Sequence, residues 1–293
     1  MGTSTGYGGP RTGLVPSWVD DPAPVAAPVP QTPTPAAPGA PGGPNAAATA
    51  RPTAEAPRPV RRPDTSGAAS LRGARGSFSR FASTGSRSAL GRALSTYVRI
   101  GTGGARRAAR RMGASRAAAT RLLGVIRDVP QVGAAEALRQ RLDLPALAGR
   151  PATDVFVALL EFVCPLGGGV EEAIARQAML EAIADLAEAG LGTFDAMLPD
   201  QLNEFFLDFV ARSIEGRVMA DLGGRGISLA EDVAAVERAE QQLHDFIGGC
   251  TRGVLAGGLD GVERLTDRDL ERVVNEIYES SFELIAAAGE AAA

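Results

Sequence analysis

Five arginines are the residues whose type and spacing best suit chemistry in this sequence. They are Arg106, Arg107, Arg110, Arg111 and Arg116. Residues four apart are neighbours on a helix. Arg106 and Arg110 are therefore expected on one face, and Arg107 and Arg111 on another. Such a surface can grip the phosphates of a nucleic acid or contact an acidic partner. It can also pack on the acidic second half of the same chain. We favour this packing, because neither stacking aromatics nor a helix-turn-helix pattern accompanies the arginines.

Side chains that could act as nucleophile, base or metal ligand are few. The chain has no lysine, which excludes a P-loop and Schiff-base chemistry. His244 is its single histidine, and Cys164 and Cys250 are its two cysteines. These three are too few for a zinc site or a disulfide framework, so we expect reduced, buried thiols and a helix-surface or core histidine. We therefore predict no catalytic residue, no metal and no cofactor.

The first segment, residues 1–19, reads MGTSTGYGGPRTGLVPSWV. Four glycines surround Tyr7, and Trp18 is the single tryptophan of the chain. Glycine permits close approach of another surface to the backbone. The segment is either a flexible terminus with incidental aromatic residues or a short linear motif that binds a groove of a partner through Tyr7 and Trp18.

Gly2 is a small residue, so removal of Met1 should be efficient and should leave a free glycine α-amine. The sixth position is Gly6 rather than serine or threonine, which does not support a lipid anchor. An α-amine at the end of a long arm could be a substrate for another enzyme.

Residues 20–66 form a Pro/Ala-rich tract, and 15 of the 20 prolines fall before residue 64. Such a composition cannot bury enough apolar surface to fold, so we expect a disordered linker with polyproline-type extension. At ~3.1 Å per residue it could span on the order of 100 Å. The sequence shows neither a secretory signal nor a run of 18 apolar residues, so we expect a cytoplasmic protein with no membrane contact.

The remaining chain is predicted to be helical, with an Arg-rich segment over residues 67–128 and an acidic domain over residues 129–293. Residues 1–150 carry 21 Arg and 7 Asp or Glu, whereas residues 151–293 carry 9 Arg and 27 Asp or Glu. Apolar residues recur at three- and four-residue steps, and no stretch alternates with a period of two. The predicted fold is all-α: a C-terminal helical bundle preceded by the Arg-rich helices and the disordered tail.

Three stretches of the sequence resemble the QatB family, the accessory proteins of the Qat anti-phage defence system. They are the start MGTSTGYGGP with LVPSWVDDP, the block SALGRALSTYVRIGTGGARRAARRMGASRAAATRLLG, and GRPATDVFVALLEFVCPLGGGVEEAIARQAMLEAIADL. The similarity covers most of the chain outside the proline-rich linker. The resemblance implies three partners: a QueC-like (QatC-type) enzyme, an ATPase and a TatD-like nuclease.

The resemblance also implies a site. QueC-like enzymes of defence systems attach a deazaguanine to an N-terminal glycine, and here the acceptor would be Gly2. The residues read by the enzyme would be Thr3, Ser4, Gly6, Tyr7, Gly8, Gly9 and Pro10, with Trp18 as a further anchor. The leading hypothesis is a non-catalytic defence protein that is modified at Gly2 and binds partners through its helices. The alternative is a nucleic-acid-binding scaffold that uses the five arginines.

Overall fold

The computed structural model describes most of the chain after residue 70. The described ranges are 71–142, 147, 149–223, 233–254 and 262–293. Residues 1–19 and 20–66, for which a peptide motif and a disordered linker were predicted, lie outside them. The described part of the chain is all-α, as predicted. It contains no β-strand, only an isolated bridge between Pro151 and Thr193.

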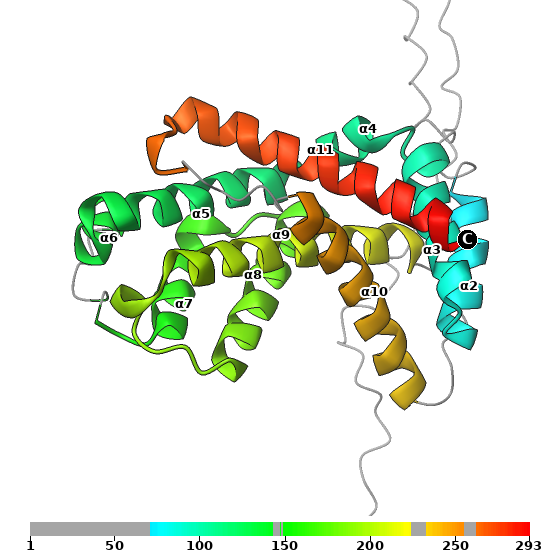
Figure 1. The fold of residues 1–293 in the computed structure, drawn as a ribbon, viewed down its shortest axis with the longest axis horizontal. Coiled ribbons are helices and arrows are strands. Elements are labelled where there is room, and N and C mark those ends of the chain that lie inside the picture. The colour runs from blue at the N-terminus through cyan, green and yellow to red at the C-terminus, as the bar shows by residue number, and fades with distance from the viewer. Residues whose placement is uncertain (1–70, 143–146, 148, 224–232, 255–261) are drawn as a thin grey trace, which may run out of the picture. The chain divides into compact units, whose positions relative to one another are not determined.

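Figure 1 shows the described helices in chain order. The first five elements are α2 (Arg72–Thr84), α3 (Arg87–Thr96), the π-helical turn η1 (Tyr97–Gly101), α4 (Ala105–Arg110) and α5 (Gly113–Val132). The next five are α6 (Ala134–Leu142), α7 (Ala152–Val163), α8 (Val170–Glu188), the 3-10 turn η3 (Phe194–Ala196) and α9 (Pro199–Leu222). The last three are α10 (Val233–Val254), the 3-10 turn η4 (Val262–Arg264) and α11 (Asp267–Ala292).

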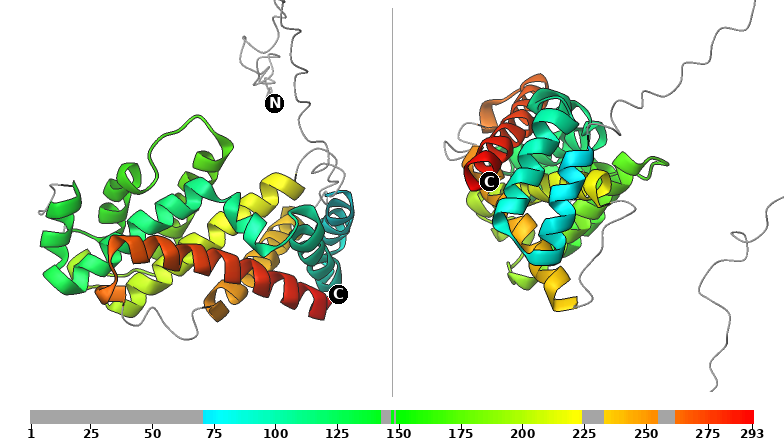
Figure 2. Two further views of the ribbon diagram at one scale, coloured as in Figure 1. Left: turned by 90° about the horizontal axis from the view of Figure 1, so that it is seen from above. Right: turned by 90° about the vertical axis from the view of Figure 1, so that its right-hand side faces the viewer.

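Helix α11 joins the Arg-rich and acidic parts of the sequence. It contacts α3, α4, α5 and α10, and Figure 2 shows it running along most of this helical body. Its start is capped reciprocally, since Thr266 accepts a hydrogen bond from the Asp269 amide and Asp269 accepts one from the Thr266 amide. Its apolar stripe is buried, with Ile277, Phe282 and Ile285 at most 3% exposed. Burial of such a stripe is the main source of helix stability in a protein.

Helix α9 packs centrally against α5, α8 and α10. It begins at Pro199, as expected for a residue that lacks an amide hydrogen and suits the first turn. Its wide apolar face is fully covered, because Phe206, Phe209 and Ile214 have no exposed surface. Phe205 stacks on Phe156 of α7 with ring centroids 3.8 Å apart. One core therefore extends from α2 to α11, and α5 runs through the boundary predicted between residues 128 and 129.

The described helices include none that is long and apolar enough to cross a membrane. Both cysteines are free thiols, with Cys164 buried and Cys250 partly buried. Burial raises the pKa of each thiol to about 11, so both stay protonated near neutral pH.

The crossing of α3 and α11 depends on two glycines that face each other. A Cβ added at Gly91 would lie 2.6 Å from the Gly289 carbonyl oxygen, and a Cβ at Gly289 would lie 2.6 Å from that of Gly91. Real Cβ atoms do not approach an oxygen so closely, so the two backbones touch only because neither residue has a side chain.

We therefore expect Gly91→Ala to lower the free energy of unfolding by about 1–2 kcal/mol. Overpacking costs about 1–3 kcal/mol, which exceeds the roughly 0.5–1 kcal/mol gained when alanine replaces glycine in a helix. The matched control is Gly76→Ala in α2, where an added Cβ would meet nothing within 4 Å. That variant should be more stable than the parent chain in urea denaturation. A shift of both variants in the same direction would contradict the close crossing.

Candidate functional site

The structure divides the five predicted arginines into two groups. Arg106 and Arg116 point toward α11, where Arg106 Nε lies 3.1 Å from Glu279 Oε1 and Arg116 donates to the Asn275 amide oxygen. The Arg106 side chain is 70% exposed, so this ion pair contributes at most about 1 kcal/mol. These contacts attach the Arg-rich helices to the last helix.

Arg111 contacts a carboxylate that is shared by several elements. Asp221, near the end of α9, accepts a hydrogen bond from Tyr97 Oη at 2.9 Å and lies 3.1 Å from Arg111 Nη2. Arg217 reaches the same carboxylate at 3.1 Å, and Arg75 of α2 donates twice to the Asp221 carbonyl oxygen at 3.0 and 2.9 Å. Burial, then the neighbouring Asp221 charge, raises the pKa of Tyr97, so its hydroxyl remains a donor. Asp221 therefore links α2, η1, the end of α4 and α9.

Arg107 and Arg110 form the second group. Both are exposed, and neither forms an ion pair with any residue that the structure describes. The Arg107 guanidinium lies beside the turn at Gly103 and Gly104, whose φ angles of +79° and +109° favour glycine. Because α4 ends at Arg110, Arg111 leaves the helix and turns toward Asp221, whereas Arg107 and Arg110 face outward.

The basic segment between Asp64 and Asp128 has a high net positive charge because it contains no acidic residues. Between Asp64 and Asp128 the sequence has 13 Arg and no Asp or Glu. Carboxylates that balance these arginines come from later helices, as in the pairs Arg99–Glu290 and Arg106–Glu279. The acidic second half thus supplies countercharges within one chain.

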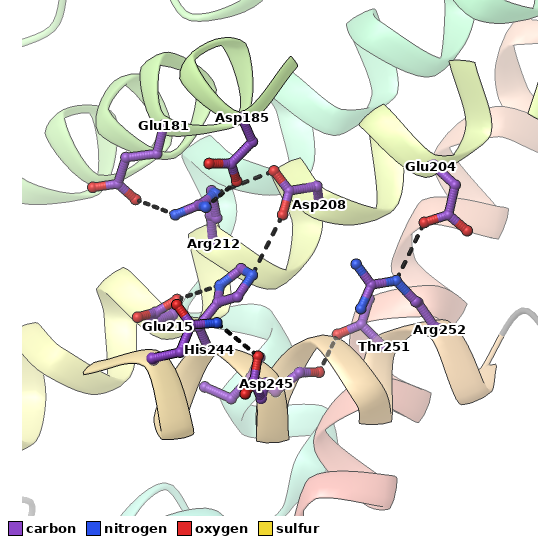
Figure 3. Close-up of polar contacts among 12 residues, drawn as sticks. Glu181, Asp185, Glu204, Asp208, Arg212, Glu215, His244, Asp245, Thr251 and Arg252 are labelled. Carbon is purple, nitrogen blue, oxygen red and sulfur yellow. Dashed lines mark hydrogen bonds and ion pairs between the residues drawn. The ribbon is translucent and has the colours of Figure 1, made fainter. Parts of the chain in front are cut away.

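A second polar cluster, not predicted from the sequence, surrounds His244 of α10 (Figure 3). Its Nδ1 lies 3.0 Å from Glu215 Oε2, and its Nε2 lies 3.7 Å from Asp208 Oδ1. The hydrogen bond to Glu215 raises the pKa of His244, and burial raises the pKa of Asp208. The imidazole therefore keeps its proton to a higher pH than a free histidine does.

Arg212 extends this cluster toward α8. It pairs with Asp208 at 3.1 Å and with Glu181 at 3.4 Å, and it also contacts Asp185 (Figure 3). The sequence held a signal for this arrangement, since Glu204, Asp208 and Arg212 follow one another at four-residue spacing on α9. The partners of these three residues on α8 and α10 depend on how the helices pack, and a local sequence pattern does not predict that packing.

The predicted N-terminal site residues are outside the described ranges. They are Gly2, Thr3, Ser4, Gly6, Tyr7, Gly8, Gly9, Pro10 and Trp18.

The described residues form an all-α body in which an arginine-rich segment pairs with acidic helices. Residues 103–285 match the family model described as QatB, the Qat anti-phage system associated protein. This match spans more than half of the chain, which belongs to the QatB family. Its role is therefore in Qat anti-phage defence. Comparison with curated proteins and with solved structures gave no match. The matched range begins after the N-terminal peptide, at the turn before α4.

Proposed function

We propose that this chain serves Qat defence as a non-catalytic protein substrate and as a partner-binding scaffold. In this proposal a QueC-like enzyme attaches a deazaguanine to the α-amine of Gly2 after Met1 has been removed. The helical body binds other components of the system, for which the ATPase and the TatD-like nuclease are the proposed candidates. The proposed reaction takes place in the cytoplasm.

The observation that carries the proposal is the N-terminal sequence. Small residues, with Tyr7 as the one large side chain before Pro10, suit a narrow cleft that must reach a terminal amine. The Pro/Ala-rich composition of residues 20–66 suits a long tether. The absence of lysine adds a further argument, because the α-amine is then the only primary amine of the chain. An amine-directed enzyme would find a single acceptor.

Co-expression with the QueC-like enzyme, followed by intact-protein mass spectrometry, tests this proposal. We expect one discrete mass increase that requires an active enzyme. An unchanged mass would overturn it.

Nucleic-acid binding is the second candidate function, and one observation favours it. Arg107 and Arg110 face outward from α4 without an ion pair to any described residue. Arginines at this spacing can contact neighbouring phosphates. Arg106, Arg111 and Arg116 are held by α9 and α11 and would contribute less than their sequence spacing indicates.

The double variant Arg107→Gln/Arg110→Gln should weaken binding to a short DNA duplex and make it less salt-dependent. Each lost phosphate contact lowers the slope of log K against log salt by about 1, so we expect a decrease of about 2. Fluorescence anisotropy at several salt concentrations measures it. Arg80→Gln/Arg87→Gln, at two other exposed arginines, is the charge-matched control. An equal decrease in both variants, or no binding at low salt, would remove a nucleic-acid site at α4.

A further inference from the structure

Two cavities share His244 as a lining residue, and together they follow α10. One, of ≈ 430 Å³, lies between the end of α8, the start of α9 and the later part of α10. The other, of ≈ 420 Å³, lies between α8, the later part of α9 and the first half of α10. His244 lines both. The lining residues of α10 run from Glu237 to Arg252, a length of roughly 22 Å at ~1.5 Å per residue. We call this the α10 groove.

The α10 groove combines apolar surface with carboxylates. Leu186, Leu191 and Phe205 line the first cavity, and Met219 lines the second. These residues give a buried apolar side chain something to pack against. The apolar lining lies mainly in the first cavity, whereas polar and charged side chains dominate the second.

Carboxylates outnumber cations along the α10 groove. Those of the first cavity are Asp185, Asp200, Glu204 and Asp208. Those of the second are Glu181, Glu215, Glu237 and Glu240. Against these eight stand two guanidiniums, Arg212 and Arg252, and the imidazole of His244.

Internal ion pairs account for only part of this negative charge. Arg212 contacts Glu181, Asp185 and Asp208 inside the α10 groove, and Arg252 contacts Glu204 near its edge (Figure 3). Three exposed carboxylates on the rim pair with no residue that the structure describes: Asp200, Glu237 and Glu240. Asp200 lies at one end and Glu237 with Glu240 at the other, so the surplus charge spans the groove.

We infer that the α10 groove binds a basic, amphipathic segment of a partner protein. The arginines or lysines of that segment would meet the rim carboxylates, and its apolar side chains would pack on Leu186, Phe205 and Met219. A small amine would fill only one cavity and leave the distant carboxylates unpaired, whereas a peptide can reach both ends. A helix that lays one apolar face into a groove is a common mode of recognition. This inference deepens the scaffold part of the proposed function, and it is independent of modification at Gly2.

A fluorescein-labelled peptide of 18 residues provides the probe. It carries leucines along one helical face and arginines on both sides of that face, and its counterpart carries glutamate in place of every arginine. The full chain should bind the arginine peptide saturably in fluorescence anisotropy, and it should not bind the glutamate peptide. Absence of saturable binding by the arginine peptide would overturn the inference.

Replacing the carboxylates at the edge of the α10 groove with amides tests whether the peptide binds there. The groove variant combines Asp200→Asn, Glu204→Gln, Glu237→Gln and Glu240→Gln. The control variant makes the same change of charge at exposed acids outside the groove: Asp195→Asn, Glu271→Gln, Glu276→Gln and Glu283→Gln. All eight positions are exposed, and circular dichroism checks that both variants keep the parent helix content. We expect Kd to rise at least ~10-fold in the groove variant and less than ~2-fold in the control, since each rim contact contributes up to about 1 kcal/mol.

Two outcomes would overturn the inference at this stage. Equal weakening in both variants would mean that the peptide binds by overall charge alone. Self-association of the chain, detected by sedimentation velocity and lost only in the groove variant, would assign the groove to a second copy instead of a partner. A failure here leaves the mass measurement on Gly2 unaffected, so the two proposals can be separated.

Discussion

Replacement of Asp221 by alanine should lower the free energy of unfolding by about 3–5 kcal/mol, the usual cost of removing one partner from a buried charge pair. The Asp221 side chain is only 13% exposed, and its neighbour Arg217 is 11% exposed. The substitution would leave the buried Tyr97 hydroxyl without its acceptor and Arg111 without its carboxylate. Because Asp221 joins elements from both parts of the sequence, its loss should also loosen the attachment of the Arg-rich helices.

Chemical denaturation followed by circular dichroism measures this effect. The matched control is Asp245→Ala on α10, where an exposed carboxylate accepts one hydrogen bond from Gln241 and a change within about 0.5 kcal/mol is expected. Asp221→Asn, which keeps an acceptor for Tyr97, should fall between the two. Equal stability of Asp221→Ala and Asp245→Ala would contradict the role assigned to Asp221.

The second large effect concerns the pH dependence of the proposed modification. An α-amine attacks only in its neutral form, and its pKa is about 7.7–8.0. With the chain below saturation, the rate of deazaguanine attachment should therefore rise about tenfold for each pH unit below pH ~7 and level off above pH ~8. Initial rates with purified enzyme and full-length chain, measured by mass spectrometry, follow this rise.

The absence of lysine provides a clean control for that experiment. The α-amine is the single primary amine that an amine-reactive acetylating reagent can reach, and hydroxylamine treatment removes any acetyl groups from thiols and phenols. The acetylated chain should gain no deazaguanine at any pH. Attachment to the acetylated chain, or a rate that is constant from pH 6 to pH 8, would place the acceptor elsewhere.

Local sequence signals mark several helix starts of the structure. They are the Thr266–Asp269 capping box of α11, Pro199 at the start of α9, and Ser86 before α3, whose hydroxyl accepts a hydrogen bond from the Ala89 amide. A cap or a proline acts through atoms one to three residues away, so a single stretch of sequence contains the information.

Helix α2 shows where local signals fail. Its sequence RGARGSFSRFAST contains two glycines and three serines, which are weak helix formers. The helix is stabilised instead by Phe78 and Phe81, which are buried in the common core, while α2 packs on α3. Tertiary packing of this kind overrides intrinsic propensity.

The polar networks also depend on contacts between helices that a single stretch of sequence does not show. Four-residue spacing grouped Arg106 with Arg110 and Arg107 with Arg111. In the structure Arg106 pairs with α11 and Arg111 with α9, whereas Arg107 and Arg110 face outward. His244 likewise gains its environment from Glu215 and Asp208, which lie 29 and 36 positions earlier on another helix. Contacts between helices determine which charges are neutralised, and the α10 groove is a consequence of those contacts.

The mass of the N-terminal peptide after co-expression with the QueC-like enzyme tests the central claim most directly. Trypsin should release residues 2–11, because Arg11 is the first cleavage site. We predict a single added mass on this peptide, located on Gly2 by fragmentation, present in Gly9→Ala and absent in Gly2→Ala. An unmodified peptide, or an adduct that persists in Gly2→Ala, would contradict the proposal that this QatB-family chain is modified at Gly2.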